Sequence, residues 1–216
     1  MGDMVVPEAT NEHVKSLIKK LGLDGPPISV TVRPDTNAVR ADCFGNVDSK
    51  VRAEGGEAVC GWCLWLFPGV WVESEFHAVW RSPDGELVDV TPKPDGDEHI
   101  LFVPDPNRTY AGRTHNTVHH LILNTDLVRR FVKLISLRTD FLESRRKPGQ
   151  QDVELADDDA ETIMEIKAAE RCLLDLVKQG GSKNRPCPCG SGSKFKHCHD
   201  KTLNLLFGVI AKLTSK

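Results

Sequence analysis

Four side chains near the C-terminal end of the chain have the chemistry and the spacing of a metal site. They lie in the segment RPCPCGSGSKFKHCHD and are Cys187, Cys189, Cys198 and His199. Zinc in proteins prefers four sulfur or nitrogen ligands arranged as a tetrahedron. A turned backbone can point the first two cysteines in one direction, and a local bend lets the adjacent cysteine and histidine share the ion. Because protein would fill all four positions, the segment predicts one structural zinc ion.

The surroundings of these ligands favour a fold that depends on the metal. A segment this short cannot bury an apolar core, so zinc binding must supply its folding energy. Basic residues favour the thiolate form of the cysteines and offer a basic rim to an acidic partner. These residues are Lys183, Arg185, Lys194 and Lys196.

The run CPCGSGSKFKHCH resembles the SEC-C motif, a small zinc module at the C-terminus of the SecA preprotein translocase and at the ends of many other bacterial proteins. The family pattern is CxC, eight residues, then CC or CH, and about sixteen residues match it. The resemblance implies a zinc-stabilised element that docks to protein partners. The rest of the chain does not resemble the SecA ATPase, because it has no GxxxxGK[ST] phosphate-binding loop.

A second set of residues could carry out nucleophilic catalysis. Cys43 stands where a short helix is expected to begin, and the dipole of a helix N-terminus favours a reactive thiolate. His77 lies on a later predicted strand and Asp89 on the strand after it. A nucleophile, a base and a group that orients the base form the general triad arrangement. Asn46, one turn into the same helix, is a candidate donor to an oxyanion.

The hairpin between the two strands decides whether this histidine and this aspartate can meet. Its sequence RSPDGEL fits a three-residue loop with Gly85 in the left-handed conformation. Such a loop pairs Ser82 with Glu86. His77 and Asp89 then share one face of the sheet as diagonal neighbours, within reach of a hydrogen bond. A two-residue loop would place them on opposite faces.

The order Cys43, His77, Asp89 and the run FHAVWRSPDGELVDVTP resemble the transglutaminase-like, papain-like cysteine hydrolase superfamily. The resemblance covers residues 40–92 and implies an α+β fold, with a helix and an antiparallel sheet as its core. It further implies that Cys43 attacks a carbonyl group of a protein or peptide. In that chemistry His77 takes the proton and Asp89 orients the imidazole.

Two other clusters of potential ligands have plainer interpretations. Cys60 and Cys63 form a CxxC pair, but the pair lies inside an apolar run and not at a helix start, so we interpret it as strand packing. His115, His119 and His120 precede a predicted helix without the glutamate of the HExxH pattern. We therefore expect surface or capping roles for these three histidines.

Periodicity and turn residues predict the elements that position these groups. Predicted helices cover residues 13–21, 43–53, 125–143 and 158–179, and predicted strands cover 28–32, 58–67, 70–80, 86–92 and 99–105. The expected organisation is an α+β domain over 1–143, a linker and connecting helix over 144–181, the zinc module over 182–200 and an amphipathic tail helix over 201–216.

Composition narrows the classes of protein. Hydrophobic residues make up 39% of the 216 residues, which suits one compact domain of roughly 100–150 residues with small appendages. No apolar run is long enough for a membrane span, and the polar start lacks the layout of a secretory signal. We therefore expect a cytoplasmic location, where reduced thiols make the seven cysteines metal ligands, nucleophiles or core residues.

Two functions of different classes are open at this point. One is a cysteine-dependent hydrolase or acyltransferase acting on protein or peptide amides, targeted by the zinc module; hydrolysis, deamidation and amide exchange share this chemistry. The other is a non-catalytic adaptor whose zinc module binds a chaperone, a translocase or the ribosome. A nucleic-acid binder would show steeply salt-dependent binding, and the net charge of -3 counts against it.

Overall fold

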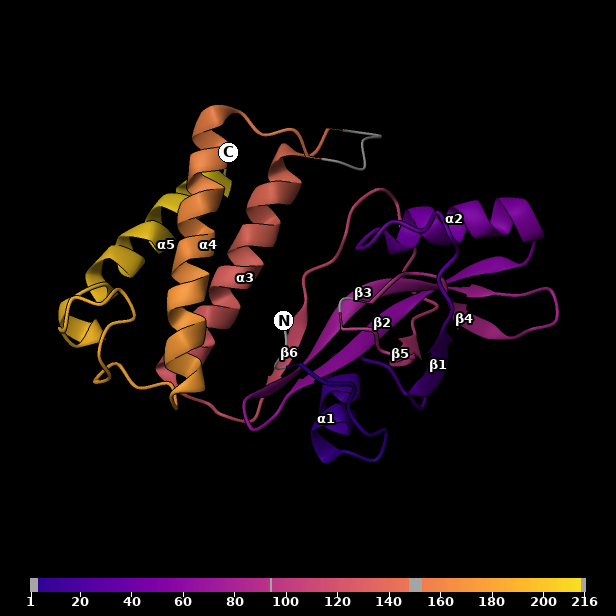
Figure 1. Cartoon of the computed structure of the whole chain (residues 1–216), viewed down its shortest axis with the longest axis horizontal. Coiled ribbons are helices and arrows are strands. Elements are labelled where there is room, and N and C mark those ends of the chain that lie inside the picture. The colour runs from indigo at the N-terminus through magenta and orange to yellow at the C-terminus, as the bar shows by residue number, and fades with distance from the viewer. Residues whose placement is uncertain (1–3, 94, 148–152, 215–216) are drawn as a thin grey trace. The chain divides into compact units, whose positions relative to one another are not determined.

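The computed structural model describes residues 4–93, 95–147 and 153–214 of the chain (Figure 1). The chain forms two compact units, Met1–Ile122 and Leu123–Lys216. The sequence placed the predicted helix 125–143 in the N-terminal domain. In the structure this helix packs against the two later helices, so it belongs to the second unit. Part of the predicted linker, residues 148–152, lies outside the described residues.

The first unit combines helices and strands, as expected for an α+β fold. Its helices are α1 (Glu12–Lys20) and α2 (Cys43–Glu54). Its strands are β1 (Ile28–Val32), β2 (Glu57–Phe67), β3 (Trp71–Arg81), β4 (Leu87–Asp89), β5 (His99–Pro104) and β6 (Val118–Leu121). The predicted helices and the first strands are confirmed to within a residue or two, whereas β4 is shorter than the predicted strand 86–92.

Both helices of the first unit begin at a side-chain cap that the sequence supplies. The side chain of Asn11 accepts a hydrogen bond from the backbone N–H of His13 at 2.8 Å. Asp42 does the same for α2, accepting from the N–H of Gly45 at 3.1 Å. These caps satisfy N–H groups that a helix start leaves without partners, and they fix Cys43 as the first residue of α2.

The strands pair in the order β2-β5-β1-β4-β3-β6, and β2 also pairs with β3. This extra pairing closes five strands into a ring, with β6 added beside β3. The pairings are antiparallel except that between β1 and β4, which is parallel. The expected purely antiparallel sheet is therefore wrong at this position, because the chain crosses over through α2, β2 and β3 before it returns beside β1.

The core of the ring is contributed by strands, and the helices pack outside it. Buried side chains of β1, β2, β3 and β5 form one cluster: Val30, Cys63, Val79, Ile100 and Phe102. Helix α2 adds Val47 to a second cluster beside β3 and β4, and α1 adds Val14, Leu17 and Ile18 to a third. Figure 1 shows the two helices on opposite sides of the strands, which lie between them.

The sequence missed strand β6, and this changes the interpretation of the histidine cluster. Residues 118–121 pair with β3, so His119 lies opposite Glu73 in the register. The His119 ring is buried at 4% exposure, with its Nε2 3.2 Å from Oε2 of Glu73. The expected surface or capping role is therefore wrong for His119, because strand pairing turns this residue inward. Apolar neighbours in TVHHLIL carried a strand signal that the adjacent histidines obscured.

The second unit is helical. It contains α3 (Asp126–Arg145), α4 (Asp157–Lys178), the short 3-10 helix η1 (Phe195–His197) and α5 (Asp200–Thr214). Thr125 caps α3 by accepting a hydrogen bond from the N–H of Val128, and α3 packs against both α4 and α5. Within the described ranges, no helix is both long enough and apolar enough to cross a membrane.

Candidate zinc centre and candidate cysteine site

The four predicted zinc ligands come together in the second unit. The sulfur and nitrogen atoms of Cys187, Cys189, Cys198 and His199 all lie within 4.8 Å of one another. Nδ1 of His199 is 3.2 Å from the sulfurs of both Cys187 and Cys198, and the sulfurs of Cys189 and Cys198 are 3.6 Å apart. Ligands of a tetrahedral zinc are separated by about 3.5–3.8 Å, as follows from zinc–ligand distances of about 2.0–2.3 Å. The donor set and its spacing therefore fit zinc.

A folded-back loop holds these donors in place. The N–H of Cys187 donates to the carbonyl of Ser193 at 2.8 Å, and the N–H of Phe195 donates to that of Arg185 at 3.0 Å. Gly190, at φ 77°, makes the tight reversal between these two sides possible. The Phe195 ring is 1% exposed and is the main apolar anchor of the loop. A metal ion held by the four donors, together with this aromatic side chain, would replace the core that so short a segment lacks.

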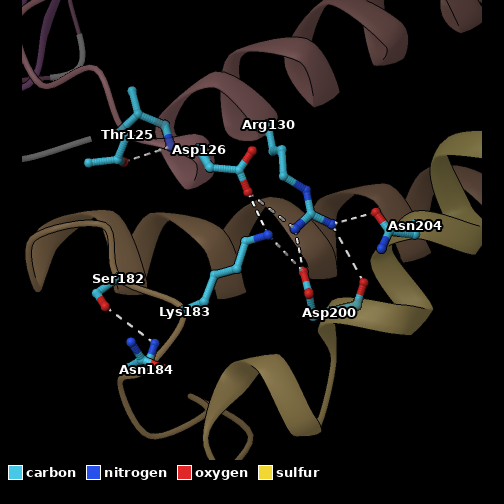
Figure 2. Close-up of polar contacts among 9 residues, drawn as sticks. Thr125, Asp126, Arg130, Ser182, Lys183, Asn184, Asp200 and Asn204 are labelled. Carbon is cyan, nitrogen blue, oxygen red and sulfur yellow. Dashed lines mark hydrogen bonds and ion pairs between the residues drawn. The ribbon is translucent and has the colours of Figure 1, made fainter.

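An ion-pair network attaches this loop to α3 (Figure 2). Asp200, directly after the last ligand, pairs with the guanidinium of Arg130, whose Nη2 also donates to Oδ1 of Asn204 at 2.8 Å. Lys183, ahead of the first ligand, lies 2.6 Å from Oδ2 of Asp126 and 3.8 Å from Oδ1 of Asp200. Both ends of the zinc loop are thus tied to the start of the same helix.

Comparison with known families identifies this loop. Residues 184–200 match the family model of the SEC-C motif. The match contains all four ligands, so the SEC-C module of this chain has a geometry suited to zinc.

Relatives with this similarity are translocase subunits. The protein translocase subunit SecA of Azoarcus sp. (strain BH72) is 34% identical over 79 residues, covering 34% of this chain and 8% of the relative. That of Cupriavidus taiwanensis is 56% identical over 36 residues, or 17% of this chain and 4% of the relative. The chain thus spans less than a tenth of the length of either relative. No solved structure matches the chain, so no known structure supports the papain-like and transglutaminase-like resemblance of the first unit.

The first unit places Cys43, His77 and Asp89 beside one another, away from the SEC-C module in the sequence. The hairpin has the predicted loop: the N–H of Ser82 donates to the carbonyl of Glu86 at 2.9 Å, with Gly85 at φ 90°. His77 and Asp89 consequently meet, with Nε2 of the ring 2.9 Å from Oδ2 of the carboxylate. The side chain of Cys43 interacts with the same ring, both through its charge and as a hydrogen-bond partner.

Electrostatics links the three groups. Burial works against a charged imidazole at His77, but the influence of Cys43 and the hydrogen bond to Asp89 outweigh it and raise the pKa of His77 to about 10. Burial likewise opposes ionisation of Asp89, yet His77 and then Lys93 hold the pKa of this carboxyl below its ordinary value. The arrangement thus favours an imidazolium at His77 that is oriented by the Asp89 carboxylate.

Access to the sulfur is restricted. Cys43 is 9% exposed, His77 3% and Asp89 fully buried. A polar cavity of about 370 Å³ in the same unit is lined by Asp105, Arg108 and His115 among others, and Cys43 is not part of its lining. A substrate would therefore need to displace side chains around the thiol.

Asn46 has a different role from the predicted oxyanion donor. Its Nδ2 donates to the carbonyl of Val39 at 2.7 Å and to Oγ1 of Thr91 at 3.2 Å, while its Oδ1 accepts from the N–H of Val39 at 2.8 Å. Both amide protons are therefore engaged, and the side chain fastens α2 to the segment before it and to the end of the hairpin. The oxyanion role is corrected to a structural one.

Sequence reasoning missed two groups near these catalytic candidates. The N–H of Thr91 donates to Oδ1 of Asp89 at 2.9 Å, and the ammonium of Lys93 lies 2.6 Å from Oδ2. The signal was present in the run DVTPK, which places a lysine four residues after the acid. The predicted CxxC pair lies within β2, where Cys63 is buried, in agreement with strand packing.

Proposed function

We propose that the chain binds a protein partner through its zinc-loaded SEC-C module. The observation that carries this proposal is the cluster of Cys187, Cys189, Cys198 and His199, whose donor atoms lie within 4.8 Å inside the segment matching the motif. With all four ligands supplied by protein, the zinc holds the loop in shape and leaves no open position for chemistry.

Charge indicates the chemistry of the partner. Arg185, Lys194 and Lys196 are exposed around the ligands, whereas Lys183 is engaged with acids of its own unit. Beside them, a groove of about 690 Å³ runs between α4, α5 and the zinc loop, and its apolar wall includes Leu205, which is 71% exposed. The partner that fits is a protein segment carrying acidic residues for the basic rim and an apolar side chain for the groove.

Charge reversal tests this proposal. The double variant Lys194→Glu/Lys196→Glu should lose the partner while retaining zinc, and zinc-stripped wild-type chain should lose it as well. The matched control is Lys15→Glu/Lys19→Glu on α1, which changes net charge equally at exposed positions of the first unit.

Affinity capture from a bacterial lysate, quantified by mass spectrometry, selects candidate partners whose capture depends on both the lysines and zinc. The proposal is supported if such a protein, once purified, binds the wild-type chain directly. It is refuted if purified chaperone, ribosomes and translocase each bind equally to the wild type, the variants and the zinc-stripped chain.

A second function is supported by the cysteine site. In it, the Cys43 thiolate attacks the carbonyl carbon of an amide, a bond from sulfur to carbon forms, and His77 delivers its proton to the departing amine. Water then releases the acyl group in hydrolysis or deamidation, and an amine does so in amide exchange. Asp89 keeps the imidazole in the required orientation. The observation in favour is the contact of His77 with both Asp89, at 2.9 Å, and Cys43.

Thiol labelling tests this second function in the zinc-loaded chain. Iodoacetamide at pH 7, followed by peptide mass spectrometry, reports the alkylation rate of each cysteine. Cys43 should react about 10-fold or more faster in wild type than in His77→Ala, because the imidazolium sustains the thiolate. His99→Ala, at an exposed histidine on β5, is the control and should leave the rate unchanged. A Cys43 rate equal in wild type and His77→Ala would leave only the adaptor function.

A further inference from the structure

A buried lysine shares the carboxylate that orients His77. The ammonium of Lys93 lies 2.6 Å from Oδ2 of Asp89 and 3.3 Å from Nε2 of His77. The Lys93 side chain is only 7% exposed, and the Asp89 side chain is fully buried. Burying an ammonium group is costly unless it is paired, so its position here requires the carboxylate.

The Asp89 carboxylate is held by three donors. Oδ2 receives hydrogen bonds from His77 and Lys93, and Oδ1 receives one from the N–H of Thr91 at 2.9 Å. Rotation of the carboxylate would break all three at once. Lys93 therefore restricts the orientation of the group that in turn orients His77.

The charge of Lys93 acts in the opposite direction from that of Asp89. A carboxylate alone stabilises the imidazolium of His77, whereas an adjacent ammonium offsets this stabilisation because like charges repel. With the Lys93 ammonium 2.6 Å from Oδ2, the negative charge of Asp89 is offset, so the carboxylate stabilises the imidazolium of His77 less than it would alone.

We propose that Lys93 is a positioning residue of the cysteine site, which aligns Asp89 and keeps the His77 imidazole able to release its proton. This inference rests on the second proposed function and concerns the same site. Lys93 acts through Asp89 and His77 and contacts no reacting atom. A lysine four residues after the acid of the triad thus sets the pH range over which Cys43 is reactive.

Other ionisable groups near His77 define the background for this effect. Cys43 faces it from α2, Asp89 from β4 and Lys93 from the segment after β4, while Cys63 on β2 and Glu75 on β3 belong to the same electrostatic neighbourhood. Lys93 is the cation among these groups, so its removal should shift the pKa values of its neighbours in one direction. Loss of a positive charge raises the pKa of each neighbouring group, and the reactivity profile moves to higher pH.

The experiment is the pH profile of Cys43 alkylation in the full, zinc-loaded chain. The rate constant with iodoacetamide is measured between pH 5 and pH 10 in wild type, Lys93→Met, Lys93→Gln and Lys93→Arg. The Met and Gln variants should shift the profile upward by about one pH unit, and Arg should restore the wild-type midpoint because it keeps the charge. Gln retains a hydrogen-bond donor for Asp89, so this variant separates the loss of charge from the loss of the hydrogen bond. It also replaces the Met variant in the experiment if Lys93→Met does not fold.

Failure of this inference is distinguishable from failure of the cysteine function. A wild-type profile equal to that of a free thiol sinks the cysteine function and this inference with it. A displaced wild-type profile that is unchanged in Lys93→Gln and Lys93→Met leaves the triad intact and overturns the role of Lys93. An equal shift in Lys93→Arg also overturns it, because the charge would then be irrelevant.

Discussion

Nε2 of His77 lies 2.9 Å from Oδ2 of Asp89, across the strand pair that the three-residue loop ending at Gly85 sets in register. The carboxylate is fully buried and ionised, so it can only accept, and Nε2 must carry the proton. The other ring nitrogen is left for the thiol side of the site. One hydrogen bond thus fixes both the tautomer and the orientation of the imidazole.

The stability of the first unit should fall as pH rises above neutrality. The pKa of His77 is raised to about 10 in the folded chain, against an ordinary value near 6.5, so the stabilisation is fully present below pH 6.5 and is lost as pH approaches 10. The expected loss between pH 6 and pH 10 is on the order of 4–5 kcal/mol. Urea unfolding at pH 6 to 10 checks it, followed by tryptophan fluorescence, since Trp62, Trp65, Trp71 and Trp80 all belong to this unit.

Variants identify the origin of this pH dependence. His77→Gln should remove most of the slope, and Cys43→Ala should reduce it, because Cys43 is the strongest influence that raises the pKa of His77. His99→Gln, at an exposed position, should not change it. A slope that persists in His77→Gln would assign the pH dependence to another group.

Asn46→Ala should destabilise the first unit by about 2–3 kcal/mol. The substitution leaves the N–H and carbonyl of Val39 without their partner and removes the hydrogen bond to Thr91. Ser49→Ala on the exposed side of the same helix is the matched control and should change stability by less than about 0.5 kcal/mol. Free energies of unfolding from urea titration provide the comparison, and equal values for the two variants would contradict the structural role of Asn46.

Cys198→Ser should abolish stoichiometric zinc binding, because it removes one of the four ligands. The control is Cys172→Ser on α4. Its thiol hydrogen-bonds to Cys187 without being among the four clustered donors, and a serine hydroxyl can still take part in this bond. Metal analysis of the purified variants should give one zinc per chain for Cys172→Ser and nearly none for Cys198→Ser. The opposite pattern would make Cys172 a ligand.

Arg130→Met should weaken zinc binding by about 10-fold, the usual effect of losing a group that supports a ligand. Arg130 holds Asp200, the residue after His199, so its loss frees the end of the loop that carries two ligands. Competition with a chromophoric chelator measures the affinity. Arg129→Met is the control and should retain wild-type affinity, because the Arg129 side chain hydrogen-bonds to Asn124 and not to Asp200 or Asn204.

Local sequence determined most of the elements and the four candidate metal ligands. Caps at Asn11 and Asp42, the apolar periodicity of the helices and the Gly85 turn are short-range signals, so they could be interpreted without a fold. The four zinc ligands lie within thirteen residues, close enough for spacing to predict one site. The hairpin register likewise followed from the loop, because a turn of defined length fixes the pairing of the strands beside it.

Only the tertiary structure decided the contacts between distant segments. The parallel pairing of β1 with β4, the addition of β6 beside β3 and the assignment of α3 to the second unit depend on packing that no local pattern encodes. The same holds for Asn46, a candidate oxyanion donor whose buried amide instead hydrogen-bonds to Val39 and Thr91. It also holds for Lys93, whose ammonium lies beside Asp89 and His77 only because the fold buries it there. Side-chain chemistry is set by residue type, but which partner a polar group meets is set by the fold, because burial leaves it few alternatives.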